Sequence, residues 1–448
     1  MRIATFDAAA VSWLAIVAAS CTSSDERAAD PVVIEVEMQR TDALDLLVVL
    51  DATDSHSEER NALTSSLPAF LDRIVAGDPS AHRPAVTDLH VGVIDSDLGT
   101  ADVAVPGCGD SGDVDGHDGV LFSGGTPLVS GCEEGAPRVR AWSRGQDLAA
   151  LTSSMACAIR SGFGCKWEQF LEATLKALTP STSDVAFLRG VGHADGANAG
   201  FRREGAVLAV LVLAYEDDCS VRDEDLYDAT SSVYREEALA LRCHRFPEAQ
   251  WPIGRYAEGL ARVVSGNLSR LVYGLLGGVP AEVSYDAERP DPTALLAHPA
   301  MQNVVDPMDP NHLRPSCNAP GYGHAFPPRR LLELAGAWPR DRIAVATCPG
   351  WPAVDAYDVA LAAMARRIGD ALGQLCLPRT LPRGTDGEPT CALTIDGVSL
   401  PRLGDDAAAS GWAVVAGADE SCPERVVITD DVRPDAGATL RFECASTP

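Results

Sequence analysis

Three oxygen-bearing side chains at alternating positions follow the first strongly apolar run of the chain. The run over 46–50 is followed directly by Asp51, Thr53 and Ser55. In an open α/β sheet, ligands bind outside the carboxyl ends of the strands, where this turn would lie. A carboxylate and two hydroxyls are oxygen ligands of the kind that Mg²⁺ prefers. The spacing therefore indicates part of a metal shell, although the same residue types are also common in turns and helix N-caps.

The segments that must position this turn alternate between strand-like and helical patterns. We expect strands at 44–50, 89–94, 206–213, 268–276 and 343–346, and helices at 58–74, 168–178, 328–337 and 355–375. Such alternation predicts an α/β fold with a mostly parallel sheet and helices on both faces. The near-continuous apolar run at 206–213 is typical of a central strand that is buried on both faces.

Composition changes along the chain predict four segments. Residues 1–20 are expected to be a lipoprotein signal peptide, 21–40 a tether, 41–376 the α/β domain and 377–448 a small β module. The last segment has short strand-like runs, and 439–444 alternates between apolar and polar residues. Long loops at 99–142, 216–257 and 285–327 all contain cysteines, which favours disulfide-stapled loops over disorder.

Four short stretches of the α/β domain, in their order along the chain, resemble the von Willebrand factor A (VWA) fold, and more narrowly a group of secreted bacterial VWA-like lipoproteins. The resemblance is carried by 45–51, 90–99, 164–169 and 216–220, and it covers 41–376. It implies a doubly wound sheet with a metal-ion-dependent adhesion site of the Asp-x-Ser-x-Ser type, in which Thr53 replaces the first Ser. It also implies a bound Mg²⁺, or Mn²⁺ or Ca²⁺ in its place, and a protein ligand.

The chain departs from the VWA pattern at two ligand positions. The second loop, 161–165, has no Thr, so that Ser161 or Glu168 would have to substitute for it. Tyr215 stands where an Asp is expected after the fourth strand, which leaves Glu216 or Asp217 to serve. The predicted metal ligands are therefore Asp51, Thr53, Ser55, Asp217 and Glu168. Because ligand number and geometry set the affinity for metals, these changes would weaken the site, favour Ca²⁺ or leave it empty.

Other motifs favour a protein without catalytic activity. Asp113, Asp115 and Asp118 lie in one loop that could bind Ca²⁺, but the loop lacks the terminal Glu of an EF-hand, and a solvated turn is the better interpretation. The sequence contains no His-Glu-x-x-His zinc motif, no Gly-x-Ser-x-Gly nucleophile elbow and no Gly-Lys-Ser/Thr phosphate loop. No nucleophile and base can be paired, so we predict that the chain is not an enzyme.

The charge balance restricts the class of partner. With 36 basic and 64 acidic residues the formal net charge is −28, which argues against nucleic acid and anionic membrane surfaces as partners. The same charge would also slow the approach of an acidic protein ligand to a metal site. A locally basic rim, for which Arg202 and Arg203 are candidates, would relieve this conflict.

The N-terminus and the number of cysteines agree on an exported, lipid-anchored protein. The apolar or small residues 8–20 are too few to span a bilayer but suit a signal peptide. Residues 18–21 resemble a lipobox, which makes Cys21 the lipidated first residue, and Thr22 at the next position resembles sorting to the outer membrane. Removing Cys21 from the 13 cysteines leaves an even 12, enough for six disulfides.

Disulfide pairing cannot be deduced from sequence, but neighbouring cysteines provide a first expectation. The expected pairs are Cys108–Cys132, Cys157–Cys165, Cys219–Cys243, Cys317–Cys348, Cys376–Cys391 and Cys422–Cys444. Disulfides of this kind indicate a compartment outside the cytoplasm.

Three functions remain after these observations. The first is a lipid-anchored, non-enzymatic module for adhesion, which binds a protein ligand at the carboxyl edge of the sheet with the help of a metal ion. The second is a structural or assembly lipoprotein whose metal site has decayed. The third, a secreted hydrolase that uses the Asp-rich loops, has the least support because no pairing of a nucleophile with a base can be proposed.

Overall fold

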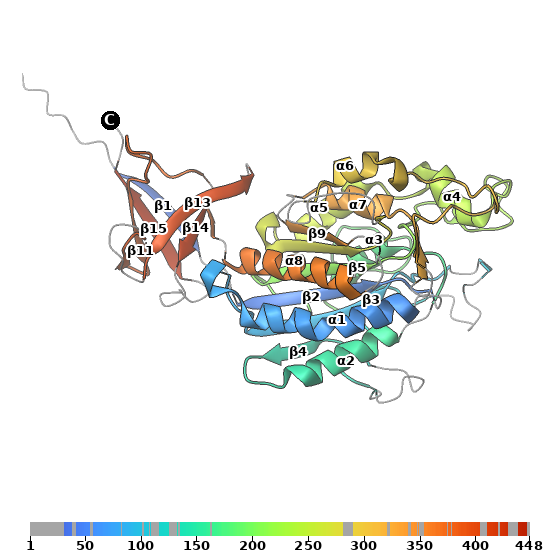
Figure 1. Ribbon diagram of the computed structural model, residues 1–448, viewed down its shortest axis with the longest axis horizontal. Helices are drawn as coiled ribbons and strands as arrows, with labels where there is room; N and C mark the ends of the chain where they lie inside the picture. Colours follow the sequence, from blue (N-terminus) through green and yellow to red (C-terminus); the bar gives the residue numbers. More distant parts are fainter. Residues whose placement is uncertain are drawn as a thin grey trace, which may run out of the picture.

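The computed structural model consists of an α/β part and a smaller part built of strands (Figure 1). It describes residues 31–37, 42–53, 57–81, 83–100, 103–106, 108, 116–124, 132, 135–161, 164–280, 290–319, 323–338, 342–346, 348, 354–373, 375–377, 379–403, 410–419, 422–428 and 438–445. Within these ranges, no helix is long and apolar enough to cross a membrane.

Six strands form the central sheet, in the order β4-β3-β2-β5-β6-β9. Their bounds are Ala43–Leu50 (β2), Asp88–Asp95 (β3), Arg140–Ser143 (β4), Val207–Leu213 (β5), Leu271–Leu276 (β6) and Ile343–Ala346 (β9). Neighbouring strands are parallel except for β4, which pairs antiparallel with β3 at the edge. The predicted α/β class with a mostly parallel sheet is confirmed.

The direction in which strands are added to the sheet reverses between β2 and β5. From β2 the chain continues to β3 and β4 on one side, whereas β5, β6 and β9 follow on the other. In the register, Leu50 at the end of β2 lies opposite Asp95 of β3 and Leu213 of β5. The carboxyl ends of three strands therefore meet at one edge, next to the point where open α/β sheets usually bind ligands.

Helices cover both faces of this sheet. One face carries α1 (Ser57–Ala76), α2 (Leu148–Arg160) and α8 (Val354–Gly373), which lie in front of the strands in Figure 1. The other face carries α3 (Phe170–Leu178), α5 (Ile253–Val263), α6 (Pro292–Ala297) and α7 (Arg329–Ala335). Successive side chains of a strand point to opposite faces, so that Leu46 of β2 joins the first core and Leu47 the second.

Helices α2, α4 (Leu239–Arg245), α5 and α6 were not predicted from the sequence. Helices α4 and α6 are too short to produce a periodic apolar pattern. Helix α2 does carry a helical stripe of buried residues, Leu151, Met155 and Ile159, and the Asp147 side chain accepts a hydrogen bond from the Ala149 amide at 2.9 Å as its N-cap. Its cap and its stripe were signals that could have identified it.

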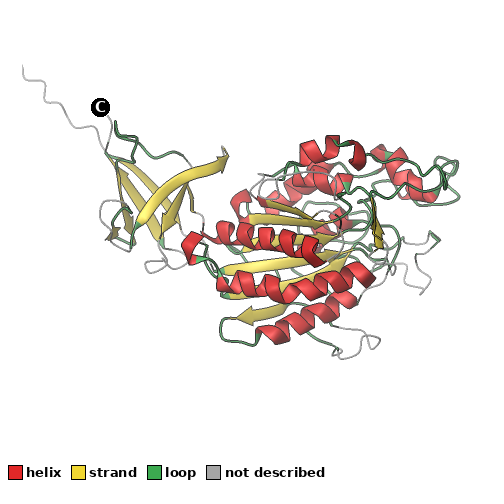
Figure 2. Cartoon of the chain, in the orientation of Figure 1, coloured by secondary structure: helices red, strands yellow, loops and turns green. Residues whose placement is uncertain are grey.

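The described residues of the C-terminal part form strands and loops without a helix (Figure 2). One sheet has the order β1-β15-β11-β12 and the other β10-β14-β13. The bounds are Val32–Glu37 (β1), Leu375–Leu377 (β10), Cys391–Ile395 (β11), Val398–Leu400 (β12), Trp412–Asp419 (β13), Cys422–Ile428 (β14) and Thr439–Cys444 (β15). Trp412, Leu440 and Phe442 belong to a separate apolar core here.

Part of the segment 21–40, which was expected to be a tether, forms strand β1 instead. Residues 32–37 pair antiparallel with β15 along their whole length, from Val32 opposite Cys444 to Glu37 opposite Thr439. The cause is the alternating pattern of this segment, which buries Ile34 in the same core as Leu440 and Phe442. The chain thus contributes a strand to the C-terminal module before it enters the α/β part.

Five disulfides connect cysteines of the described residues. Cys219–Cys243 and Cys317–Cys348 confirm two of the expected pairs. The pairs Cys108–Cys165, Cys132–Cys157 and Cys391–Cys444 show that the other expected pairs, Cys108–Cys132, Cys157–Cys165, Cys376–Cys391 and Cys422–Cys444, were wrong. Proximity in sequence did not predict these pairs, because strand pairing determines which cysteines meet in space. Cys391, for example, lies directly opposite Cys444 in the β11–β15 register. This number of disulfides is typical of exported proteins.

Candidate binding site

Asp51 lies at the reversal point of the sheet, directly after β2. One oxygen of its carboxylate accepts from the amide and the hydroxyl of Thr53, at 3.0 and 2.5 Å. The other oxygen accepts from the amides of Tyr215 and Glu216, at 3.2 and 3.5 Å. The residue is only 1% exposed. Asp51 therefore holds the carboxyl ends of β2 and β5 together, and Thr53 lies beside it as predicted.

Two further segments are fixed to the same turn. The hydroxyl of Ser96, which follows β3, accepts from the Ala52 amide at 3.1 Å, and the Gly164 amide donates to the Ala52 carbonyl at 2.8 Å. Below the turn, the buried guanidinium of Arg60 donates to the carbonyls of Asp51 and, at 2.9 Å, of Ser161. The turn after β2 is thus held by backbone and side-chain contacts from several segments.

Two glutamates accompany Asp51 at this edge. Glu168, just before α3, is 4% exposed, and its Oε1 atom has no hydrogen-bond partner among the described residues. Burial, together with the charges of Glu216 and Asp51, raises the pKa of Glu168 well above its usual value. Burial and the charge of Asp51 raise the pKa of Glu216 to about 8. The three carboxylates repel one another, so that a positive charge would stabilise their ionised forms.

Asp217, a predicted metal ligand, faces a different element. Its two carboxylate oxygens accept from the Arg330 amide, at 2.9 and 3.0 Å, at the start of α7. Burial raises the pKa of Asp217 to about 7 even though these contacts oppose the shift. The next residue, Asp218, accepts from the Leu171 amide at 2.9 Å and from the Arg330 guanidinium at 3.0 Å. The acid after β5 whose charge acts on the Asp51 cluster is therefore Glu216.

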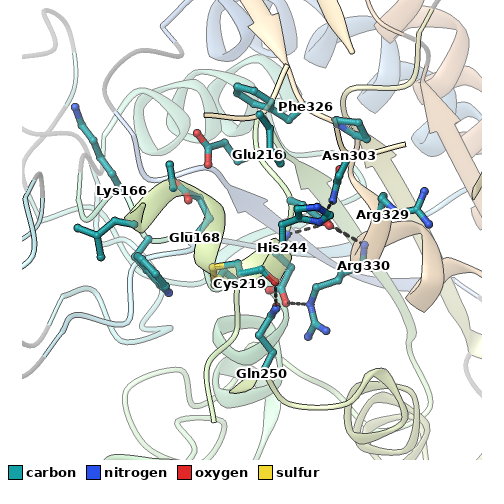
Figure 3. A pocket seen from close by; sticks show the side chains of 18 of the residues that line it. Lys166, Glu168, Glu216, Cys219, His244, Gln250, Asn303, Phe326, Arg329 and Arg330 are labelled. Atoms are coloured by element: carbon teal, nitrogen blue, oxygen red, sulfur yellow. Dashed lines mark hydrogen bonds and ion pairs between the residues drawn. A yellow bond between two sulfur atoms is a disulfide. The ribbon is translucent and has the colours of Figure 1, made fainter. Parts of the chain in front are cut away.

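A cavity of about 440 Å³ opens next to these carboxylates. Its walls come from the segment after β5 and the segment before α3, from α4 and the segment that follows it, from residues near 303–313 and from the start of α7. Figure 3 shows Glu168 and Glu216 at one end, and His244, Asn303 and Arg329 at the other. Apolar side chains complete the lining, among them Trp167, Leu239, Pro247, Leu313, Phe326 and Pro327.

Several buried polar atoms of this lining lack hydrogen-bond partners in the described part of the chain. Besides Glu168 Oε1, they are the acceptors Gln250 Oε1 and Asn303 Oδ1 and the donor Trp167 Nε1. Gln250 is only 3% exposed, and its amide nitrogen donates to the Cys243 carbonyl. Sequence reasoning missed Trp167, Gln250 and Asn303 because no local pattern indicates which loops meet in space.

Other residues singled out from the sequence lie elsewhere. Ser55, Asp113, Asp115 and Cys21 fall outside the described residues. Asp118 contacts the Lys176 ammonium at 2.5 Å and His193 at 2.9 Å. The expectation of a basic rim at Arg202 and Arg203 was wrong, because both side chains pair with Asp45 near the start of β2, at the opposite end of the strand from Asp51.

The described residues do not bring all of the predicted metal ligands together, and Ser55 lies outside them. The two oxygens of Asp51 already accept from four donors, and Asp217 faces the start of α7. Over the described ranges, no group of three or more His, Cys, Asp and Glu side chains is arranged to hold a metal ion. Asp51, Thr53 and Glu168 lie at this edge, and the third acid beside them is Glu216.

Comparisons with known proteins were made for the whole chain. No protein-family model matches it, and no curated protein matches it. Among solved structures, the pilus adhesin SpaC from Lactobacillus rhamnosus GG, in an open conformation, aligns with 92% of this chain and 40% of its own length, at 10% identity and a TM-score of 0.33. A second crystal structure of this adhesin aligns with 92% of this chain and 40% of its own length, at 10% identity and a TM-score of 0.32. The chain thus spans about two fifths of these structures, and TM-scores of this size are too low to assign a common fold.

Proposed function

We propose that this chain is a lipid-anchored, non-enzymatic module with VWA-like architecture that binds a protein ligand at the carboxyl edge of its central sheet. The observation that carries the proposal is the cavity of about 440 Å³ lined by Glu168 and Glu216, and several buried polar atoms of this lining lack partners among the described residues. Buried polar groups are nearly always hydrogen-bonded in folded proteins. A ligand that enters the cavity would supply the missing partners.

The lining favours binding over catalysis. Among the described residues, it contains no serine or threonine, and its cysteines Cys219 and Cys243 form a disulfide with each other. A hydrolase therefore remains the weakest of the three functions.

The metal-dependent form of the proposal remains a prediction. It would use Asp51, Thr53, Ser55 and Glu168 as oxygen ligands of Mg²⁺, Mn²⁺ or Ca²⁺. The alternative is a structural or assembly lipoprotein with a decayed metal site, for which the same edge would be a protein contact surface without a metal. The incomplete ligand set described above supports this alternative, and a titration with divalent cations separates the two.

A variant that fills the cavity tests the proposed function. Ala240 is exposed in α4 and lines the cavity, so Ala240→Trp would obstruct it without removing a core contact. Ala197→Trp, exposed in a loop outside the cavity, is the matched control. Envelope proteins captured by the immobilised chain should be lost with Ala240→Trp and retained with Ala197→Trp. Capture that is equal in both variants would contradict binding at this edge.

The lipid anchor has its own test. Cys21→Ser should release the protein from membranes, because a thioether-linked lipid can form only at this cysteine in the predicted signal. An unchanged share of protein in the membrane fraction would refute the anchor without affecting the binding proposal.

A further inference from the structure

We propose that the cavity receives an arginine side chain of a basic protein partner, with its guanidinium placed between Glu168 and Glu216. This inference rests on the proposed function, because the arginine belongs to the protein ligand. It goes beyond it by naming the chemistry that the ligand presents.

The acidic end of the cavity is lined by Lys166, whose charge acts on Glu168, but in the described residues no cation is paired with either glutamate. No ion pair joins a lysine or arginine to Glu168 or Glu216, although Glu168 is 4% exposed and its Oε1 atom lacks a partner. Lys166 lines the cavity but is exposed. Arg330 is committed to Asp218 and to the Trp251 carbonyl, at 3.0 and 2.8 Å. A buried carboxylate without a cation is costly, so an incoming positive charge would be bound favourably.

The unpartnered acceptors of the lining point independently to a ligand with many N–H groups. Gln250 Oε1 and Asn303 Oδ1 are two further neutral acceptors elsewhere in the lining, which backbone N–H groups of a peptide could satisfy. A guanidinium carries five donors and no acceptor, whereas an ammonium carries three. The one unpartnered donor, Trp167 Nε1, requires an acceptor, which the backbone carbonyl of a peptide supplies. The carboxylates therefore favour arginine, and the neutral acceptors and the donor favour a peptide as its carrier.

The walls of the cavity suit the stem of such a side chain. Leu239, Leu313 and Phe326 provide apolar surface along which methylene groups can pack. A volume of about 440 Å³ lies within the range of ligand pockets, which is roughly 300–1,000 Å³. Arginine is also less strongly hydrated than lysine and forms bidentate contacts with carboxylates, so it loses less on entering a buried site.

The charge of the whole chain favours a basic partner. A net charge of −28 attracts basic proteins and repels acidic ones over distances longer than a contact. At the far end of the cavity, burial and the neighbouring Arg245 and Arg329 lower the pKa of His244, which favours its neutral form. The guanidinium of Arg329 is itself held by the carbonyls of Leu296 and Met301, at 3.1 and 2.8 Å.

Short peptides test the inference on the full chain. A capped Gly-Gly-Arg-Gly-Gly peptide is compared with the same peptide carrying citrulline, which has nearly the same shape but no charge, and binding is measured by NMR titration. We expect the arginine peptide to bind about tenfold or more tightly than the citrulline peptide, since a buried charge pair is being formed. Equal binding of the two peptides would overturn the inference.

Variants of the chain locate the contact. Glu168→Gln and Glu216→Gln should each weaken binding of the arginine peptide about tenfold. Glu258→Gln, which removes the same charge from an exposed position on α5, should leave it unchanged. An equal effect of all three variants would show that the peptide responds only to the net charge of the chain, and it would overturn the proposed contact. Because a glutamate variant could misfold, Ala240→Trp provides a second block of the cavity and should also abolish binding.

The outcomes separate this inference from the proposed function. Loss of protein capture with Ala240→Trp, combined with no preference for the arginine peptide, would overturn the arginine and leave the binding module intact. Protein capture that is insensitive to Ala240→Trp would overturn the proposed function itself. Agmatine that binds as tightly as the arginine peptide would assign the cavity to a small guanidine and overturn the protein partner.

Discussion

The guanidinium of Arg203 donates to the carboxylate of Asp45 at 2.7 Å, inside the central sheet and at the end opposite the candidate site. Asp45 is fully buried in β2 and also accepts from the Arg203 amide, at 2.7 Å, and from Arg202, at 3.0 Å. The segment before β5 is thereby tied to β2. Asp51 ties the same two strands at their carboxyl ends, so the pair β2–β5 is fixed by a buried aspartate at each end.

Removal of the Asp45 carboxylate should strongly destabilise the fold. Asp45→Ala leaves the largely buried Arg202 without its counter-ion and Arg203 with Asp88 as its remaining partner, and breaking a buried pair in this way typically costs about 3–5 kcal/mol. Asp184→Ala, which breaks the exposed contact between Asp184 and Arg262, should cost less than about 1 kcal/mol. Urea unfolding of both variants measures the difference, and similar losses would contradict a structural role for Asp45.

Gly164 should not tolerate a side chain. A Cβ atom at this position would lie 2.2 Å from the Oδ2 atom of Asp97, whose carboxylate accepts from the Gly99 and Cys165 amides at 2.8 and 3.0 Å. Gly164→Ala should therefore lower the free energy of unfolding by about 1–3 kcal/mol through overpacking. Gly254→Ala, in open space within α5, is the control and should be neutral or stabilising by roughly 0.5–1 kcal/mol. A stable Gly164→Ala variant would show that the turn can move.

Disulfide mapping tests the pairing. Non-reducing digestion and mass spectrometry should recover Cys108–Cys165 and Cys132–Cys157, and thiol counting should find essentially no free thiol among the 12 cysteines after Cys21. The double change Cys108→Ala with Cys165→Ala should lower stability by about 2–5 kcal/mol. Recovery of Cys108–Cys132 would restore the pairing expected from sequence neighbours and contradict the fold of these loops.

Much of the α/β fold could be predicted because its strands carry unambiguous patterns. The apolar runs that became β2 and β5 are buried along their whole length, and α1 carries the stripe of Leu63, Leu67 and Phe70. Strand β1 could not be placed, because its partner β15 lies about 400 residues further along the chain. Local patterns contain no information on such distant pairing.

For the candidate site, the sequence predicted the location at the carboxyl edge of the sheet but not the full set of residues that form it. The position of Asp51 and Thr53 follows from the end of a central strand. Which of three consecutive acids faces Asp51 depends on how the chain turns after β5, and Asp217 is drawn away by the Arg330 amide at the start of α7. The cavity walls contributed by Gln250 and Asn303 come from segments that meet only in the folded chain.

Glu59 of α1 should make stability depend on pH. Burial, with smaller effects of the Glu58 and Asp51 charges, raises the pKa of Glu59 to about 7 from its usual 4.5. The folded state therefore binds the proton more tightly than the unfolded state, and this contribution is fully present below pH 4.5 and lost as the pH rises through 7. Glu59→Gln should be more stable than the wild type above pH 7, by about 1–3 kcal/mol.

Unfolding of both proteins by urea at several pH values measures this effect. The difference in stability between Glu59→Gln and the wild type should grow from pH 4.5 to pH 7 and then level off. A difference that does not change with pH would show that Glu59 keeps its usual pKa. Glu258→Gln, exposed on α5, provides the control for a surface charge.

A titration with divalent cations decides between the metal-dependent module and the decayed site. If Mg²⁺, Mn²⁺ or Ca²⁺ binds, a concentration of 100 times the dissociation constant should stabilise the fold by about 2.7 kcal/mol, which is visible as a rise in melting temperature. Asp51→Asn should abolish this rise. The variant itself should lose stability, because the Asp51 carboxylate accepts from Thr53, Tyr215 and Glu216. The informative quantity is therefore the change caused by the metal within each protein.

A wild type that does not respond to any of the three cations would refute the metal-dependent form. A full response in Asp51→Asn would place the metal elsewhere, most simply in the loop of Asp113, Asp115 and Asp118.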